Sequence, residues 1–223
     1  MGGRDNCSNP WLSIPASDYE GHMKSPRVLQ QQFLSAVFRG VLERFRPRSV
    51  AVPGCATGNG FEHIDPRVTQ TVVGIDINPE YIALARDRFA AGLPGLRLLC
   101  LDIADCDLES RSLDLVHCAL VLEYIDPRIA VLKSASWLRA GGVLSVVLQL
   151  PSPGHEKVTV TEYKSVACLD AAMHLVEPGD VDRVAGEAGL RLDAARVETL
   201  ESGKSFYVAT YKLAGDARLD SSS

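Results

Sequence analysis

Residues 49–60 read Ser-Val-Ala-Val-Pro-Gly-Cys-Ala-Thr-Gly-Asn-Gly, a short apolar run that passes into a turn rich in glycine. Small residues in such a turn let a ligand approach the backbone, and a helix starting behind the turn would offer free N–H groups. A glycine-rich turn after a strand is weak evidence when it stands alone. The sequence on either side decides whether the turn is a ligand site or only a tight turn.

From residue 48 onward, apolar runs typical of strands alternate with helical patterns. We expect strands at residues 49–53, 72–75, 96–101, 113–119 and 143–150, and helices that begin at Asn78-Pro79, at Asp126-Pro127 (ending near Gly141-Gly142) and at Pro178. Capping residues and prolines mark these helix starts, and glycine marks their ends.

The last two predicted strands, residues 191–200 and 204–213, are separated only by Glu201-Ser202-Gly203, which indicates a hairpin. Strand–helix alternation gives a parallel sheet, and the hairpin adds an antiparallel pair. The sequence therefore predicts an α/β fold with a doubly wound, seven-stranded mixed sheet. The sheet would be mostly parallel, with a C-terminal antiparallel hairpin and helices on both faces.

We expect four regions along the chain. Residues 1–47 would form an N-terminal extension, with a helix that starts at Ser25-Pro26 and stops at Pro47. Residues 48–213 would form the main domain. Within it, residues 151–177 break the rhythm and suggest an insert with one short helix around residues 161–174. Residues 214–223 are expected to be a tail, and residues 1–9 and 216–223 look frayed because they lack apolar periodicity.

Composition excludes several classes of protein. The 223 residues are 46% hydrophobic, enough for one sizeable core, and carry a formal charge of −5. Binding to a nucleic-acid backbone needs clustered Lys and Arg, so we expect no nucleic-acid partner. The sequence has neither an apolar run long enough to span a bilayer nor the pattern of a signal peptide. We therefore expect no membrane partner and a cytoplasmic location.

The six cysteines contain no CxxC pair, so we expect no metal site. Five of them lie among apolar or small residues and are expected to be reduced thiols in core-like settings. The six are Cys7, Cys55, Cys100, Cys106, Cys118 and Cys168.

Functional residues are expected directly after each strand, because ligands of such sheets bind beyond the carboxyl ends of the strands. Asp76 follows the second strand, where an acid accepts both hydroxyls of a ribose. Asp102 and Ile103 follow the third and suit the amino group and ring face of an adenine. The alternatives are that Asp76 is a helix-start acid and Asp102 a turn residue. The three signals in order favour a cofactor site.

Together these residues resemble the motifs of class I S-adenosylmethionine-dependent methyltransferases, a Rossmann-like superfamily. The resemblance rests on Val50–Gly58, Val73–Asn78, Asp102-Ile103, Leu113–Val116, the strand after Leu138–Gly142 and the closing hairpin, and covers about residues 48–213. It implies that Gly54, Ala56 and Gly58 line the methionine part of the cofactor. Asp76 would bind the ribose, Asp102 and Ile103 the adenine, and Ala119 would lend backbone. The full expected cofactor site comprises Gly54, Cys55, Ala56, Thr57, Gly58, Asp76, Ile77, Asp102, Ile103, Ala119, Tyr19 and His22.

Two positions depart from the family pattern. Val52 stands where the family usually has an acid, and Ala56 stands where it has a second glycine. The missing acid removes a partner for the cofactor's ammonium end, which an N-terminal residue would have to replace. Residues 10–23 are rich in aromatic and polar groups and too irregular for a core element. We expect them to cover the cofactor as a lid; the alternative is a packed extension without ligand contact.

Methyl transfer from a sulfonium needs mainly alignment, with a base only if the acceptor carries a proton. Candidate bases are Glu123, Tyr124, His155, Glu162, Tyr163 and His174, although the reaction can proceed without one. The acidic composition and the short insert favour a small-molecule acceptor. Two other functions stay open: a non-catalytic S-adenosylmethionine-binding protein, and an NAD(P)-dependent oxidoreductase. The latter prefers glycines spaced GxGxxG, unlike Gly54, Gly58 and Gly60.

Overall fold

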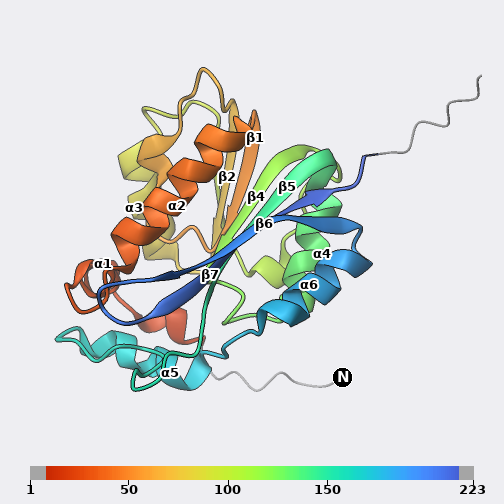
Figure 1. Cartoon of the computed structure of the whole chain (residues 1–223). Helices are drawn as coiled ribbons and strands as arrows, with labels where there is room; N and C mark the ends of the chain where they lie inside the picture. Colours follow the sequence, from red (N-terminus) through yellow and green to blue (C-terminus); the bar gives the residue numbers. More distant parts are fainter. Residues whose placement is uncertain (1–8, 216–223) are drawn as a thin grey trace, which may run out of the picture.

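The computed structural model describes residues 9–215 and contains a seven-stranded sheet (Figure 1). The strand order is β3-β2-β1-β4-β5-β7-β6, parallel from β3 to β5, with β7 antiparallel to both of its neighbours. The strands are β1 (Ser49–Pro53), β2 (Thr71–Asp76), β3 (Leu96–Cys100), β4 (Leu113–Ala119), β5 (Leu138–Gln149), β6 (Leu190–Thr199) and β7 (Ser205–Leu213). The predicted fold class is confirmed, and the strand order reverses between β1 and β4.

Helices cover both faces of the sheet (Figure 1). They are α1 (Ala16–Lys24), α2 (Gln30–Phe45), α3 (Pro79–Phe89), α4 (Pro127–Trp137), α5 (Leu169–Ala172) and α6 (Pro178–Glu187). Within residues 9–215, four 3₁₀ helices accompany them: η1 (Pro10–Ser13), η2 (Phe61–His63), η3 (Ile103–Asp105) and η4 (Lys164–Cys168). The predicted caps Asn78 and Asp126 both accept hydrogen bonds from the first turns of their helices, α3 and α4.

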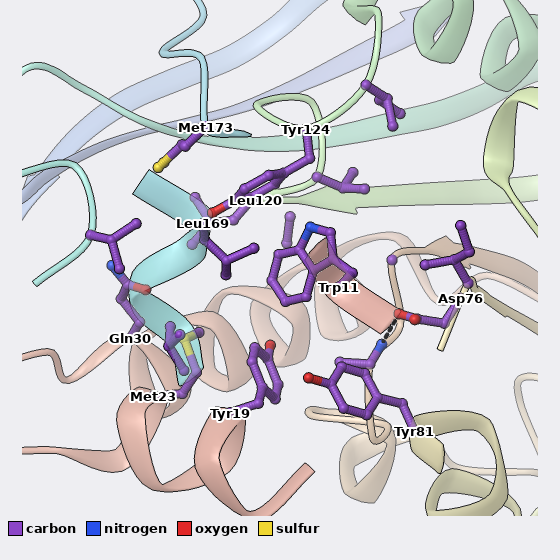
Figure 2. A pocket seen from close by; sticks show the side chains of 18 of the residues that line it. Trp11, Tyr19, Met23, Gln30, Asp76, Tyr81, Leu120, Tyr124, Leu169 and Met173 are labelled. Carbon is purple, nitrogen blue, oxygen red and sulfur yellow. Dashed lines mark hydrogen bonds between the residues drawn. The ribbon is translucent and has the colours of Figure 1, made fainter. Parts of the chain in front are cut away.

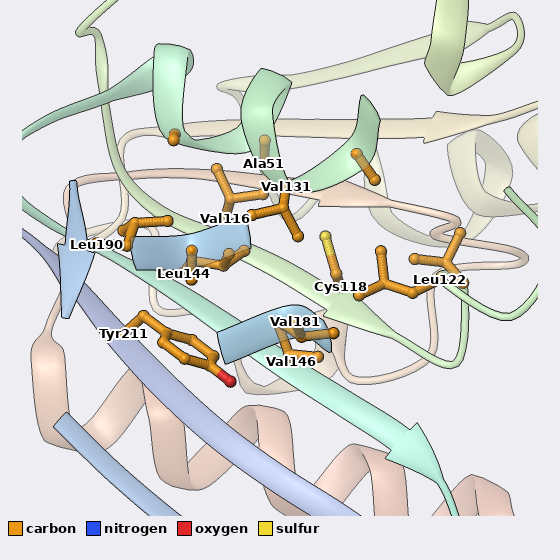
Figure 3. Close-up of a cluster of buried hydrophobic side chains, with 14 of the residues drawn as sticks. Ala51, Val116, Cys118, Leu122, Val131, Leu144, Val146, Val181, Leu190 and Tyr211 are labelled. Atoms are coloured by element: carbon orange, nitrogen blue, oxygen red, sulfur yellow. The ribbon is translucent and has the colours of Figure 1, made fainter. Parts of the chain in front are cut away.

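Two apolar layers hold the helices on the sheet, because alternate side chains of a strand point to opposite faces. Val50 and Val52 of β1 face α2 and α3. The intervening Ala51 belongs to the layer beneath α4 and α6. Figure 3 shows that second layer, in which Val131 and Val181 from the two helices meet buried side chains of β4 and β5.

The N-terminal region differs from the sequence-based expectation. The helix predicted from Ser25-Pro26 begins instead at Gln30, after Leu29 with a positive φ of 57°. Ser25 ends the preceding helix α1, where its N–H donates to the carbonyl oxygen of His22. Residues 10–23, which looked too irregular for a core element, belong to η1 and α1, and Ala16, His22 and Met23 bury one face of α1.

The glycine-rich turn is also followed by less helix than predicted. After β1 the chain makes turns and then the three-residue η2 before entering β2. The link from β3 to β4 contains only η3. Strict strand–helix alternation was therefore wrong for these two links, and no α-helix N-terminus stands behind the turn at residues 54–60.

The helix predicted to end near Gly141-Gly142 ends at Trp137, and β5 begins with the next residue. Leu138 already pairs with Leu113 of β4, and the register then shifts before Val143 pairs with Leu115. A Cβ at Gly142 would lie 2.9 Å from the carbonyl oxygen of Arg139. The glycines thus allow a bend within the strand rather than a helix end.

In the predicted insert, the single helix expected at residues 161–174 is replaced by the shorter η4 and α5. The closing hairpin is confirmed, and the N–H of Leu200 donates to the carbonyl oxygen of Lys204 across its turn. The insert and the hairpin turn lie at the same end of the molecule as α1 (Figure 1).

The cysteine expectation holds in part. Cys55, Cys106 and Cys118 are buried free thiols, whereas Cys100 and Cys168 are exposed, which corrects the prediction for those two. Cys7 and the predicted frayed ends, apart from Asn9, lie outside the described residues. Residues 9–215 contain no group of three or more side chains that would hold a metal ion. Within the same range, no helix is long and apolar enough to cross a membrane.

Candidate cofactor and acceptor site

A pocket opens at the carboxyl ends of β1, β2, β3 and β4, the edge where the strand order predicts a ligand (Figure 2). It encloses about 1120 Å³, part of it open to solvent. One side is formed by strand-end residues, and the other by α1, α2, the insert and the hairpin. Of the expected cofactor residues, Gly54, Ala56, Asp76, Ile77, Asp102, Ile103, Ala119, Tyr19 and His22 line it.

The glycine turn is held against β2. The N–H groups of Gly54 and Cys55 both donate to the carbonyl oxygen of Ile75. Gly54 and Ala56 have positive φ values of 69° and 45°, so Ala56 adopts a conformation that favours glycine. Both residues line the pocket, but Cys55 does not, because its side chain lies in the apolar layer beneath α2 and α3.

Thr57 and Gly58, also expected to contact the cofactor, do not line the pocket either. The Thr57 hydroxyl donates to Glu20 of α1 at 2.6 Å. Gly58 packs against Phe89, whose ring would lie 2.6 Å from a Cβ at this position. The small residues in this half of the turn thus serve the packing of α1 and α3 against the turn.

Asp76 connects the turn to α3. Its Oδ2 accepts a hydrogen bond from the N–H of Ala56 at 2.9 Å (Figure 2). Its Oδ1 accepts one from the N–H of Asn78, also at 2.9 Å. Burial raises the pKa of this carboxyl, while the hydrogen bonds from the backbone lower it. Each carboxylate oxygen has a second lone pair, so the side chain can also accept from a ligand hydroxyl. Asp76 therefore has a structural role in addition to the role expected for it.

Asp102 and Ile103 form the next part of the wall. Oδ1 of Asp102 accepts from the N–H of Ala104 at 2.8 Å and so caps η3, which agrees with the alternative of a turn residue. The same residue lines the pocket beside Ile103, whose side chain is buried. Both interpretations of Asp102 are compatible with this geometry.

Aromatic side chains line the centre of the pocket. Two of them, Trp11 and Tyr81, were not among the expected site residues. Trp11 meets Tyr124 edge-on with ring centroids 4.9 Å apart, and Tyr19 stacks on Tyr81 at 5.3 Å. Asn78, the cap of α3, donates from its side chain to the carbonyl oxygen of Trp11 at 2.8 Å and thereby fixes η1. The aromatic content of residues 10–23 was the available signal for Trp11.

Tyr81 carries a polar group that needs a partner. Its hydroxyl is buried and has no hydrogen-bond partner among the described residues. Figure 2 shows the hydroxyl pointing toward Tyr19, across the pocket. A buried hydroxyl without a partner is costly, and a bound ligand would satisfy it. Nothing in the sequence distinguished this tyrosine from a core residue.

Val52 lies in the apolar layer beneath α2 and α3 and does not line the pocket. An acid from α1 approaches the same turn instead. Glu20 accepts from Thr57 and forms an ion pair with Arg88 of α3. Burial would raise the pKa of Glu20, but the hydrogen bonds from Arg88 and Thr57 lower it to about 2. Glu20 is therefore a carboxylate beside the turn.

Of the candidate bases, only Tyr124 lines the pocket. Glu123 is fully buried: its Oε1 accepts from the N–H of Gln149 at 2.8 Å, and its Oε2 has no partner among the described residues. Burial raises the pKa of Glu123 to about 7. Glu123 joins the end of β4 to the end of β5. His155, Glu162, Tyr163 and His174 lie outside the pocket lining.

Residues from the end of β5, the start of α2, the insert and the hairpin turn form a polar end of the pocket that the sequence analysis missed. They are Gln30, Gln149, Lys157 and Lys204. His22 lies with them, and its Nδ1 is hydrogen-bonded to Thr161 Oγ1 at 3.0 Å. Burial and the charge of Lys204 lower the pKa of His22 to about 4, so its ring is neutral at physiological pH. Only the tertiary structure brings these residues together.

Comparison with known proteins agrees with this geometry. Residues 52–146 match a family model described as a methyltransferase domain. No curated protein matches the sequence. The matched methyltransferase domain and the sheet topology agree with the resemblance of the sequence motifs to class I S-adenosylmethionine-dependent methyltransferases.

Solved structures share the fold at low sequence identity. A protein described as a possible exported protein from Bordetella parapertussis superposes with a TM-score of 0.66 at 18% identity, covering 92% of this chain and 81% of that one. The N-methyltransferase NodS from Bradyrhizobium japonicum WM9 gives 0.62 at 17% identity, covering 86% and 99%. Geranyl diphosphate C-methyltransferase from Streptomyces coelicolor A3(2), bound to S-adenosyl-L-homocysteine, gives 0.63 at 10% identity, covering 82% and 80%.

Proposed function

We propose that the protein is an S-adenosylmethionine-dependent methyltransferase. It would transfer a methyl group to a small molecule bound at the end of the pocket formed by α1, α2, the insert and the hairpin. One observation carries the proposal: a single pocket joins the strand-end residues of the cofactor site to side chains contributed by all four of these segments. The acceptor and the cofactor would therefore share one pocket, as direct methyl transfer requires.

On the cofactor side, we assign Asp76 to the ribose hydroxyls and Asp102 with Ile103 to the adenine. Gly54, Ala56 and Ala119 would border the methionine part. The buried Tyr81 hydroxyl has no hydrogen-bond partner among the described residues and lines the same pocket, which supports occupation by a polar ligand. Cys55, Thr57 and Gly58 would support the turn from behind.

S-adenosylmethionine supplies a methyl group already activated on a sulfonium. The residues of this chain would align the acceptor for in-line attack and exclude water, the task of Trp11, Tyr19 and Tyr124 at the centre of the pocket. Tyr124 would accept a hydrogen bond from a protonated acceptor, since it lines the pocket. The segment from Trp11 to Met23 would act as the lid over both ligands.

A known protein with this fold supports a small acceptor, since the Streptomyces C-methyltransferase is described with geranyl diphosphate. The acidic composition supports an acceptor other than nucleic acid. A cytoplasmic location accords with these features and stays a prediction.

Ligand-dependent melting tests the proposal. S-adenosylhomocysteine should raise the melting temperature, because a ligand that binds only the native state stabilises it by mass action. NAD is the matched control and should leave the melting temperature unchanged. A shift from NAD and none from millimolar S-adenosylhomocysteine would refute the proposal. Turnover of labelled S-adenosylmethionine against a metabolite panel then distinguishes an enzyme from a protein that only binds the cofactor.

A further inference from the structure

The polar end of the pocket consists of buried side chains from four separate elements. His22 of α1, Gln30 of α2, Gln149 of β5 and Lys204 before β7 all line the pocket, and each is less than a tenth exposed. Figure 2 shows Gln30 on the far side of the pocket from Asp76. A charged side chain is almost never fully buried unless it is paired, so Lys204, 2% exposed, needs an explanation.

One hydrogen bond holds the ammonium group of Lys204 and leaves its other N–H donors available. Its Nζ donates to the carbonyl oxygen of Lys157 at 2.6 Å, and Gln149 donates to the same oxygen at 2.9 Å. Lys157 in turn donates to the carbonyl oxygens of Asp170 and Met173. An ammonium group has three donors. Within residues 9–215, one acceptor is found for Lys204.

Charge is also unbalanced at this end. No carboxylate of the described residues lies within ion-pair distance of Lys204 or Lys157. Burial lowers the pKa of Lys204 to about 8, while the more distant carboxylates of Asp170 and Glu156 raise it. Lys204 thus stays mainly protonated at neutral pH. A buried ammonium without a counterion is unfavourable, and an anion from outside the chain would compensate it.

We propose that the methyl acceptor is a small molecule with an apolar body and one anionic group, a carboxylate or a phosphate, and that Lys204 binds this group. The amides of Gln30 and Gln149 lie beside the anion. The apolar body packs on hydrophobic side chains of the same pocket, namely Met23, Leu34, Leu120, Leu169 and Met173. This inference rests on the proposed function, because it names the substrate class of that site.

The anion is distinct from the carboxylate of the cofactor's methionine. The expected methionine site lies at Gly54, Ala56 and Ala119, at the ends of β1 and β4. Lys204 precedes β7, and β5 separates β7 from β4. Two strand spacings of roughly 4.8 Å place β7 about 10 Å from β4. Lys204 therefore lies on the acceptor side of the pocket.

Calorimetry with probes that differ only in charge tests the proposal. Hexanoate, hexyl phosphate and the neutral hexanamide are titrated into the protein saturated with S-adenosylhomocysteine. The proposal requires that at least one anionic probe binds more tightly than hexanamide. Lys204→Met should weaken that binding tenfold or more, because it removes a charge-assisted hydrogen bond. Lys164→Met, at an exposed lysine of the same insert, is the control and should bind like wild type.

The two anions distinguish a carboxylate acceptor from a phosphate acceptor, and either result supports the proposal. Equal binding of hexanamide, no binding of either anion at millimolar concentration, or unchanged binding by Lys204→Met would overturn it. So would a loss of S-adenosylhomocysteine affinity in Lys204→Met with probe binding intact, which would assign Lys204 to the cofactor. Should Lys204→Met not fold, Lys204→Gln, which keeps a donor for Lys157, replaces it.

Melting of the ligand-free variant supplies a second readout. Lys204→Met should be at least as stable as wild type, because it removes a buried charge without a counterion. If Lys204 served only to hold the Lys157 backbone, Lys204→Met would be less stable than wild type and would bind the probes with unchanged affinity. If wild type itself does not bind S-adenosylhomocysteine, the proposed function fails. Anion binding to the ligand-free protein still decides the role of Lys204.

Discussion

The hydroxyl of Thr57 donates to Oε1 of Glu20 at 2.6 Å and so fixes the N-terminal helix α1 to the glycine-containing turn. The same carboxylate contacts Arg88 of α3. Since Tyr19, His22 and Met23 of α1 line the pocket, this contact couples the turn expected to hold the cofactor to the wall that would cover it. The hypothesis that residues 11–23 form a lid can therefore be tested by removing the hydrogen bond between Thr57 and Glu20.

Hydrogen exchange of residues 11–23 should slow when S-adenosylhomocysteine is added, because the ligand would hold α1 and η1 closed. Thr57→Val keeps the size of the side chain and removes the hydroxyl. It should speed exchange in α1 and weaken ligand binding. If exchange at residues 11–23 stays unchanged while residues 54–60 become protected, the cofactor binds without a lid and residues 11–23 only pack against the domain.

Asp76→Ala should weaken S-adenosylhomocysteine binding roughly tenfold to a hundredfold, the effect of losing about 1.5–3 kcal/mol from a charged acceptor. It should also destabilise the protein, because the N–H groups of Ala56 and Asn78 lose their partner. Asp76→Asn keeps one acceptor oxygen and should retain more stability than Asp76→Ala. Calorimetry gives the affinity and urea unfolding the stability. A dissociation constant within about twofold of wild type would mean that Asp76 serves only the backbone.

Tyr81→Phe should leave stability unchanged or slightly higher, because the hydroxyl has no partner in the protein. It should weaken S-adenosylhomocysteine binding by about 0.5–1.5 kcal/mol, the typical contribution of a neutral hydrogen bond. Tyr211→Phe is the matched control, since its hydroxyl donates to Asp182 at 2.7 Å away from the pocket. That variant should lose stability and keep its affinity. The reverse pattern would contradict a ligand role for Tyr81.

Glu123 should make the protein less stable as pH rises. Burial raises the pKa of Glu123 to about 7, above its ordinary value of 4.5, so the folded state keeps a proton that the unfolded state releases. The stability contribution is therefore complete below pH 4.5 and is lost as pH rises through about 7. Glu123→Gln removes this titration. Melting temperatures across this range should fall less for the variant, and an identical slope would show that Glu123 is not protonated in the fold.

Much of the architecture was predictable because it depends on local signals. Asn78 and Asp126 cap their helices as expected, and the short turn before Lys204 forms the hairpin. The strand ends fixed which residues meet at one edge of the sheet, so most of the expected cofactor residues line one pocket. The sequence-based predictions were wrong where tertiary contacts determine the ends of an element. Ser25 looked like a helix start but ends α1, because packing of His22 and Met23 extends the helix before it.

By itself, the amino-acid sequence determined the fold class, the family resemblance and the edge of the sheet that carries the site, because strand periodicity and turn chemistry act over a few residues. Only the tertiary structure decided that Cys55 and Gly58 pack away from the pocket while Tyr81 faces it. It also decided that Gln30, Gln149 and Lys204 meet, since they are far apart in the chain and α2, β5 and β7 come together only in the folded sheet. Burial, and with it the pKa of Lys204, follows from that assembly and leaves no trace in local sequence.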